Sequence, residues 1–198
     1  SGSTAKNYLG SDYVYDEYST AVYGIMMNTK KSIFKSDKLR YALLFASDKS
    51  TLSLPFGYSA ADGIVAPSVK NSLGGYRDTA GNRTAVKPDE IKAYSSYQSA
   101  CENIDKADLH SVNILAVQNR DEEIGESLGG ILQQWQAKLG FYCSISYVSE
   151  SEYDEKIASG DYTLALARIN GDYNRPEAYL RQFTDSGYKY SAMDDTYS

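Results

Sequence analysis

The most regular hydrophobic pattern in the chain lies between Glu122 and Leu139. Its hydrophobic residues recur at intervals of three, four and seven, which is typical of an α-helix with one buried face: Ile124, Leu128, Ile131, Leu132, Trp135 and Leu139. Gly140 follows, and glycine often ends a helix in the left-handed conformation. The pattern predicts an amphipathic helix, and it favours a core position for Trp135 over a role as a ligand platform.

After Gly140 the hydrophobic period changes from that of a helix to that of a strand. Residues 141–148 alternate, with four residues predicted on the buried side: Phe141, Cys143, Ile145 and Tyr147. Ser149 then suits the start of a helix that stops near Gly160. Residues 162–169 are almost wholly apolar, which is typical of a strand covered on both faces.

The order of these elements predicts the fold class. A further apolar strand is expected at 112–117, so strand and helix alternate along 112–169. Such an order favours an α/β fold whose mostly parallel sheet has helices packed on it. Ligands tend to bind at the carboxyl ends of the strands in such sheets, so the segment after residue 169 is the first place to look for a site.

The first half of the chain is less regular. We expect a strand at 20–27, a helix from Asp37 with Leu39, Ala42, Leu43 and Ala46 on one face, and a long surface loop at 52–86. Residues 1–19 are poorly patterned and are predicted to be extended or partly ordered. A second helix is predicted from Pro88 to about Ile104, carrying Ile91, Tyr94, Ser95, Gln98 and Cys101.

Size and charge narrow the class of protein. The 198 residues are ample for one domain and short for two, and 42% of them are hydrophobic. The net charge of -6 argues against nucleic acid or an anionic membrane as the main partner. No run of 18 apolar residues occurs, so no membrane-spanning helix is predicted. The 19 tyrosines serve either as contact surfaces or as half-buried sheet residues.

The chain carries little that suggests catalysis. Its single histidine, His110, falls between a predicted helix and a strand, where a loop or cap role is expected. Zinc-ligand spacings such as Cys-x-x-Cys are absent, so we predict no metal, no cofactor and no enzymatic activity. Cys101 and Cys143 either form one disulfide or remain free thiols.

Five stretches carry motifs: 27–49 (MNTKKSIFKSDKLRYALLFASDK), 63–67 (GIVAP), 134–141 (QWQAKLGF), 160–162 (GDY) and 171–176 (GDYNRP). They resemble the extracellular oligopeptide- and dipeptide-binding proteins that serve ABC importers, family 5 of the solute-binding proteins. The stretch 63–67 has one proline fewer than the loop of that family. The order and spacing of the five stretches over roughly 20–190 match the family.

The resemblance implies a type II periplasmic-binding-protein-like lobe. Residues 1–198 would be one α/β lobe, part of the C-terminal lobe of a two-lobed protein, and would close on a peptide or peptide-like solute together with the missing second lobe. The solute would pass to an ABC permease. Proteins of this family are exported, so the chain is expected outside the cell, either lipid-anchored at the cell surface in the full-length protein or in the periplasm.

The resemblance also implies a site. Asp172 takes the position that holds the ligand ammonium group, and the strand edge formed by Arg168, Ile169 and Asn170 would pair with an extended peptide through its main chain. Asp172 could instead cap the helix that starts near Pro176. Many family members have glycine at the position of Arg168 and tryptophan at that of Ile169. The solute is therefore open between an oligopeptide, a dipeptide, a signalling peptide, a glycan and a metal chelate.

Two other functions fit the same sequence. The chain could be a ligand-sensing domain of a transcriptional or signalling regulator, which a helix-turn-helix elsewhere in the intact gene would indicate. It could also be a surface interaction module without a small ligand, which unchanged solute binding after Asp172→Ala would favour.

Overall fold

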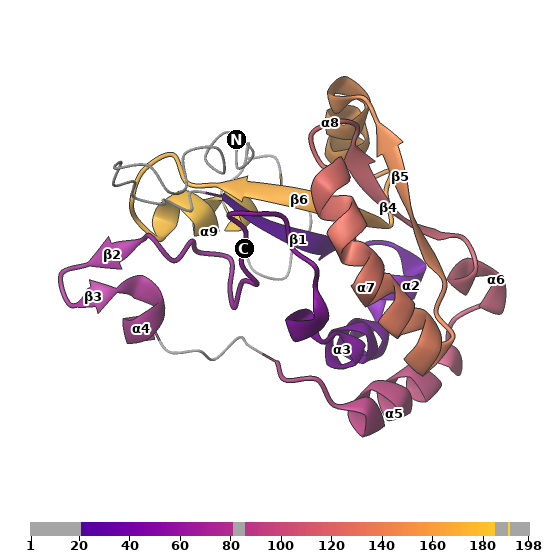
Figure 1. Ribbon diagram of the computed structural model, residues 1–198. Helices are drawn as coiled ribbons and strands as arrows, with labels where there is room; N and C mark the ends of the chain where they lie inside the picture. Colours follow the sequence, from indigo (N-terminus) through magenta and orange to yellow (C-terminus); the bar gives the residue numbers. More distant parts are fainter. Residues whose placement is uncertain (1–20, 81–85, 185–189, 191–198) are drawn as a thin grey trace.

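Figure 1 shows the computed structural model, which describes residues 21–80, 86–184 and 190. The segment 1–19, for which the sequence predicts little order, lies outside these residues.

A four-stranded sheet with the order β1-β6-β4-β5 forms the centre of the molecule. Its strands are β1 (Ala21–Met27), β4 (Val112–Val117), β5 (Cys143–Val148) and β6 (Leu164–Asn170). β4 is parallel to both β5 and β6, whereas β1 runs antiparallel to β6. The predicted α/β fold with a mostly parallel sheet is therefore confirmed.

The two helices that connect the parallel strands end as the sequence predicts. α7 (Glu122–Leu139) joins β4 to β5, and α8 (Glu150–Ser159) joins β5 to β6 (Figure 1). Each is followed by a glycine in the left-handed region, Gly140 at φ 68° and Gly160 at φ 72°. The Ser149 hydroxyl caps α8 by accepting a hydrogen bond from the backbone N–H of Glu152 at 3.2 Å.

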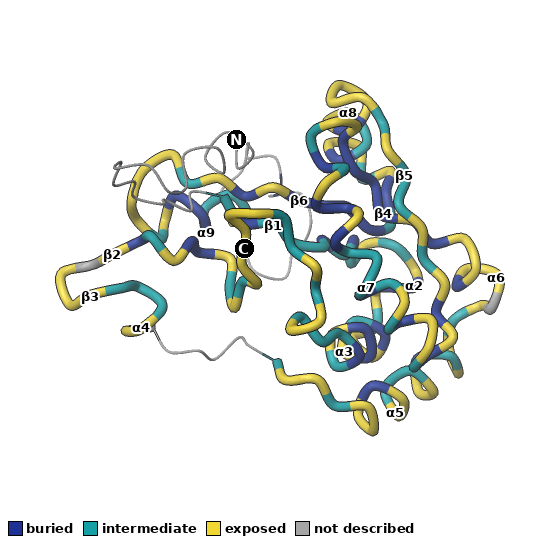
Figure 2. The backbone as a smooth tube through the Cα atoms, viewed as in Figure 1, coloured by how far each residue is buried: buried dark blue, intermediate teal, exposed yellow. Residues whose placement is uncertain are grey.

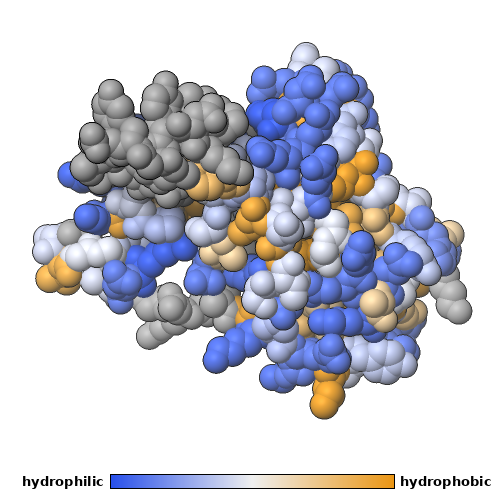
Figure 3. All heavy atoms as spheres, in the orientation of Figure 1, coloured by the Kyte–Doolittle hydropathy of each residue, from blue (hydrophilic) through white to orange (hydrophobic). Residues whose placement is uncertain are grey.

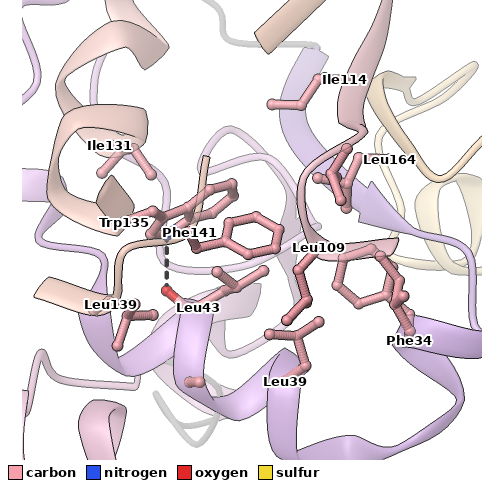
Figure 4. Close-up of a cluster of buried hydrophobic side chains, with 14 of the residues drawn as sticks. Phe34, Leu39, Leu43, Leu109, Ile114, Ile131, Trp135, Leu139, Phe141 and Leu164 are labelled. Atoms are coloured by element: carbon pink, nitrogen blue, oxygen red, sulfur yellow. Dashed lines mark hydrogen bonds between the residues drawn. The ribbon is translucent and has the colours of Figure 1, made fainter. Parts of the chain in front are cut away.

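A first core lies between the sheet and α2 (Ser32–Lys35), α3 (Asp37–Ala46), α5 (Glu90–Cys101) and α7 (Figure 4). Trp135 is 2% exposed, and its ring packs edge-on against Phe141 at 5.9 Å between centroids. The indole N–H donates to the carbonyl of Leu43 at 3.0 Å and to the hydroxyl of Ser47 at 2.9 Å. The core position predicted for Trp135 is confirmed.

A second core fills the opposite face of the sheet. It contains residues of α8, of α9 (Glu177–Thr184) and of the segment 65–69, together with Tyr190. β6 contributes Leu164 and Leu166 to the first core and Ala165 and Ala167 to the second. As predicted, this strand is covered on both faces, and Figure 2 shows it as one of the buried parts of the sheet.

The helix predicted at 88–104 is present, with somewhat shorter limits. α5 begins at Glu90, after an N-cap at Asp89, and ends at Cys101. Ile91 is 83% exposed, whereas Ala93 is fully buried. The buried residues of α5 are the two alanines Ala93 and Ala100, whereas its Ile91 and Tyr94 are exposed. α6 (Lys106–Leu109) follows, and His110 is its C-cap residue.

The segment 52–86, expected to be a long surface loop, is more structured than its sequence suggests. It contains β2 (Lys70–Asn71), β3 (Gly74–Gly75) and α4 (Tyr76–Ala80), while residues 81–85 lie outside the described part. Val65, Ala66 and Val69 are buried in the second core. Three buried residues are too few to produce a recognisable hydrophobic period, although they pack the segment against the second core.

The edge position of β5 explains another difference from the prediction. Tyr147, expected on the buried side, is 37% exposed, because only one neighbouring strand and the helix α7 shield β5. Cys101 and Cys143 are both partly buried and free, so the disulfide alternative is not what the structure shows. Burial raises the pKa of the Cys143 thiol to about 12.

Candidate functional site

The residues predicted to contact solute lie where β6 ends and α9 folds back over it (Figure 1). β6 ends at Asn170, and Gly171 and Asp172 begin the turn that leads to α9. Gly171 is packed against α9 so closely that an added Cβ would collide with the ring of Tyr179. This turn is therefore held against the helix.

Asp172 is exposed and carries an ion pair. Its Oδ2 lies 2.8 Å from Nη2 of Arg181 on α9, and 66% of its side chain remains accessible. The Arg181 guanidinium also lies over the ring of Tyr173, 5.2 Å from the centroid. A carboxylate is present at the end of the strand, but a cation of the same chain already occupies one of its oxygens.

The three strand residues of the predicted site differ in their surroundings. Arg168 and Asn170 are exposed, whereas Ile169 is 4% exposed and belongs to the second core. Arg168 faces Tyr23 of β1 in the strand register, and the Tyr23 ring lies 6.3 Å from that of Tyr58. Burial raises the pKa of Tyr23, and the Arg168 charge partly opposes this rise. The side chains available to a solute are thus those of Arg168 and Asn170.

The main-chain edge expected at 168–170 is not open. On one side β1 pairs with it, since Val22 lies opposite Ile169. On the other side, β4 pairs with β6 only at Leu164 and Ala165. Beyond that point, side chains donate hydrogen bonds to the strand carbonyls. The carbonyl of Leu166 accepts from Tyr153 Oη at 3.0 Å, that of Arg168 from Tyr190 Oη at 3.3 Å, and that of Asn170 from Gln182 Nε2 at 2.6 Å.

The prediction of an open edge is therefore wrong, because it considered β6 without its distant partners. β1 lies more than 130 residues before the strand's end, and the tyrosines come from other elements. A peptide could pair with this edge only by displacing the groups that now cap it.

A buried ion pair at the end of β4 was missed by the sequence analysis. Asp121 has no exposed surface, and its carboxylate accepts hydrogen bonds from the Val117 N–H at 2.8 Å and from Arg120 Nε at 2.8 Å and Nη2 at 3.0 Å. Arg120 also reaches Glu150 at 2.9 Å, and its hydrogen bond with Asp121 raises the pKa of its guanidinium. These contacts fix the turn between β4 and α7. The sequence showed only an acidic residue before a helix.

Two buried tyrosines lie next to this pair. The Arg120 guanidinium is 5.6 Å from the centroid of the Tyr153 ring, and burial raises the pKa of Tyr153 and of Tyr190. Their hydroxyls satisfy strand carbonyls that would otherwise be buried without a partner. These two tyrosines therefore support the sheet.

A cavity of about 280 Å³ lies elsewhere, lined by residues of β4, of β5, of α8 and of the segment that leads into β6. Its charged lining residues are already engaged: Asp161 lies 3.7 Å from Lys31 and 3.6 Å from Lys156, which is 3.8 Å from Glu152. Figure 3 shows the mostly hydrophilic surface of the α8 region. Because its charged groups are paired with one another, this cavity is the weaker candidate.

The sequence model described as "Bacterial extracellular solute-binding proteins, family 5 Middle" matches residues 3–191. The chain belongs to this family. No curated protein matches it by sequence.

Solved structures resemble this family 5 chain over most of its length. The structure of the pheromone receptor PrgZ matches with a TM-score of 0.73 and 22% sequence identity, and the match covers 94% of this chain and 37% of the PrgZ chain. The Bacillus anthracis oligopeptide ABC transporter substrate-binding domain has a TM-score of 0.72 at 23% identity, covering 98% and 39%. Listeria monocytogenes OppA bound to peptide has a TM-score of 0.73 at 19% identity, covering 96% and 38%.

These likenesses show the fold, which is that of the periplasmic binding proteins. The chain spans 37–39% of the length of these three structures. Among the residues that the structure describes, no helix is long and apolar enough to cross a membrane.

Proposed function

We propose that the chain is one lobe of the peptide-binding component of an ABC importer. Family membership over residues 3–191 carries this proposal. It is supported by the neighbours, whose descriptions include "mode of peptide binding" for PrgZ and "bound to peptide" for the Listeria protein. The family is one of solute-binding proteins, which favours this role over that of a regulator of the same fold.

In this proposal Asp172 receives the ammonium group of the peptide. Its accessible carboxylate stands just beyond the end of β6, and a hydrogen bond assisted by opposite charges contributes about 1.5 to 3 kcal/mol. The exposed side chains of Arg168 and Asn170, on the same side of the strand, would contact the rest of the ligand. Ile169 would act indirectly, by anchoring the strand in the core.

The lobe would work together with a second lobe of the full-length protein. Closure of the two lobes around the solute would create the form that the permease recognises, and no residue of this chain would act as a catalyst. The complete protein would operate outside the cell, lipid-anchored at its surface or in the periplasm.

Calorimetric titration with a library of di- to pentapeptides tests the proposal. The full-length protein should bind at least one peptide, and the isolated chain should bind it at least tenfold more weakly, because it provides only part of the contacts. Asp172→Ala in the full-length protein should weaken binding by about tenfold or more, the equivalent of at least 1.5 kcal/mol. No binding to the full-length protein, or equal affinity of the isolated chain, would reject the proposal.

A further inference from the structure

α9 makes three contacts with the segment that follows Arg168. Arg181 Nη2 pairs with Asp172 Oδ2 at 2.8 Å, and Gln182 Nε2 donates to the carbonyl of Asn170 at 2.6 Å. The ring of Tyr179 closes against Gly171. One short helix thus engages the strand end at a carboxylate, at a main-chain carbonyl and by packing.

These contacts have the chemistry that an extended peptide would bring. A peptide's amino terminus is a cation seeking a carboxylate, and its amide N–H groups seek strand carbonyls. Arg181 supplies the first kind of group and Gln182 the second. In this conformation both positions are filled from within the chain.

We infer that α9 is a built-in competitor for the ligand, in which Arg181 occupies the carboxylate that a ligand ammonium group needs. The inference rests on the proposed function and adds a residue that sets affinity and selectivity. Ligands with a free amino terminus must compete with Arg181 for the charge of Asp172, whereas ligands lacking that charge do not enter this competition.

Both competing groups can leave at little cost, because each has a second interaction in place. The Arg181 guanidinium lies over the Tyr173 ring at 5.2 Å, which attracts a cation after Asp172 is released. Gln182 Nε2 also donates to the carbonyl of Ala178, 2.8 Å away in the same helix. Side-chain rotation would therefore be enough to release the strand end.

The exposure of the pair sets the size of the effect. Asp172 is 66% and Arg181 29% accessible, so water and salt screen their attraction. Exposed ion pairs contribute roughly 0.2 to 1 kcal/mol, which corresponds to at most about a fivefold change in affinity. Arg181 would thus tune binding rather than block it.

The test compares Arg181→Gln with the wild type in the full-length protein. The tightest-binding tripeptide from the library is titrated with a free and with an acetylated amino terminus. We expect Arg181→Gln to bind the free peptide about two- to fivefold more tightly, since the competitor is gone, and to bind the acetylated peptide as the wild type does. Arg181→Lys, which keeps the cation, should stay close to the wild type.

Arg175→Gln is the matched control. Arg175 is exposed in the same turn, and its removal changes the net charge equally without touching Asp172. Weaker binding of the free peptide by Arg181→Gln would mean that Arg181 orients Asp172 for the ligand, which overturns the inference. So would an equal gain in Arg175→Gln, an equal gain for the acetylated peptide, or no change. If the wild type binds no peptide at all, the proposed function itself fails, and the competitor with it.

Discussion

Asp121 illustrates how much a single side chain can determine at the residue scale. Its carboxylate is fully buried and accepts three hydrogen bonds, two of them from Arg120. Such a group is stable only while its partners remain, because a buried charge without a partner is costly. It therefore fixes the turn in which β4 meets α7.

Asp121→Asn should lower the free energy of unfolding by about 2 kcal/mol, somewhat less than for a fully buried pair, because 22% of the Arg120 side chain is exposed. Glu150→Gln removes the other, 66% exposed partner of Arg120 and should cost less than about 0.5 kcal/mol. Urea unfolding followed by circular dichroism measures both. Equal losses in the two variants would contradict this account.

The sequence could supply the position of Asp172 but not its partner. The motif at 171–176 predicted a carboxylate at the end of a strand, and the structure has one there. Arg181 lies nine positions later, and nothing in its immediate neighbourhood indicates that its helix turns back toward the strand. The same limit applies to Asp121, whose burial depends on the sheet as a whole.

At the scale of elements, the glycines of α7 differ in what they do. Gly140 ends the helix at φ 68°, a conformation that other residues adopt only with strain. Gly129 sits inside the helix, where an added Cβ would meet no atom within 4 Å. The first glycine is therefore needed for its backbone, and the second is not.

Opposite effects of one substitution follow from this difference. Gly140→Ala should destabilise the protein by about 1 kcal/mol, through strain at the left-handed residue. Gly129→Ala should stabilise it by roughly 0.5 to 1 kcal/mol, because alanine loses less backbone entropy in a helix. Urea unfolding midpoints measure both changes in stability. Midpoints that shift in the same direction in the two variants would contradict the prediction.

Elements were predictable where their own residues carry the pattern. α7, α8 and β6 have dense and regular hydrophobic positions, so their limits agree with the prediction within a few residues. α5 is different, since its buried residues are two alanines, while Ile91 and Tyr94 are 83% and 57% exposed. Strand pairing was hidden for a related reason: the register of β1 with β6 is a property of two distant segments together.

At the scale of the whole molecule, buried tyrosines link stability to pH. Burial raises the pKa of Tyr162 to about 12, and it also raises those of Tyr153 and Tyr190. The folded chain therefore holds these protons more tightly than the unfolded chain, whose phenols ionise near pH 10. Their contribution is complete below about pH 10 and is lost as the pH rises toward 12.

The thermal midpoint should accordingly fall as the pH is raised from 9 to about 12, and Tyr162→Phe should make this fall shallower by removing one ionising group. Scanning calorimetry at a series of pH values measures both curves. A midpoint that is constant over this range, or a variant as steep as the wild type, would show that these phenols do not govern the alkaline transition.

The sheet divides the interior into two separate compartments, one under α3, α5 and α7 and the other under α8 and α9. Side chains on one side are separated by the sheet from most of those on the other, so substitutions in the two halves can accumulate largely independently. Only the backbone positions of the strands between them must be preserved. A lineage built in this way can replace most of its amino acids and still be recognisable by shape, as the 22% and 23% identities with the matching structures illustrate.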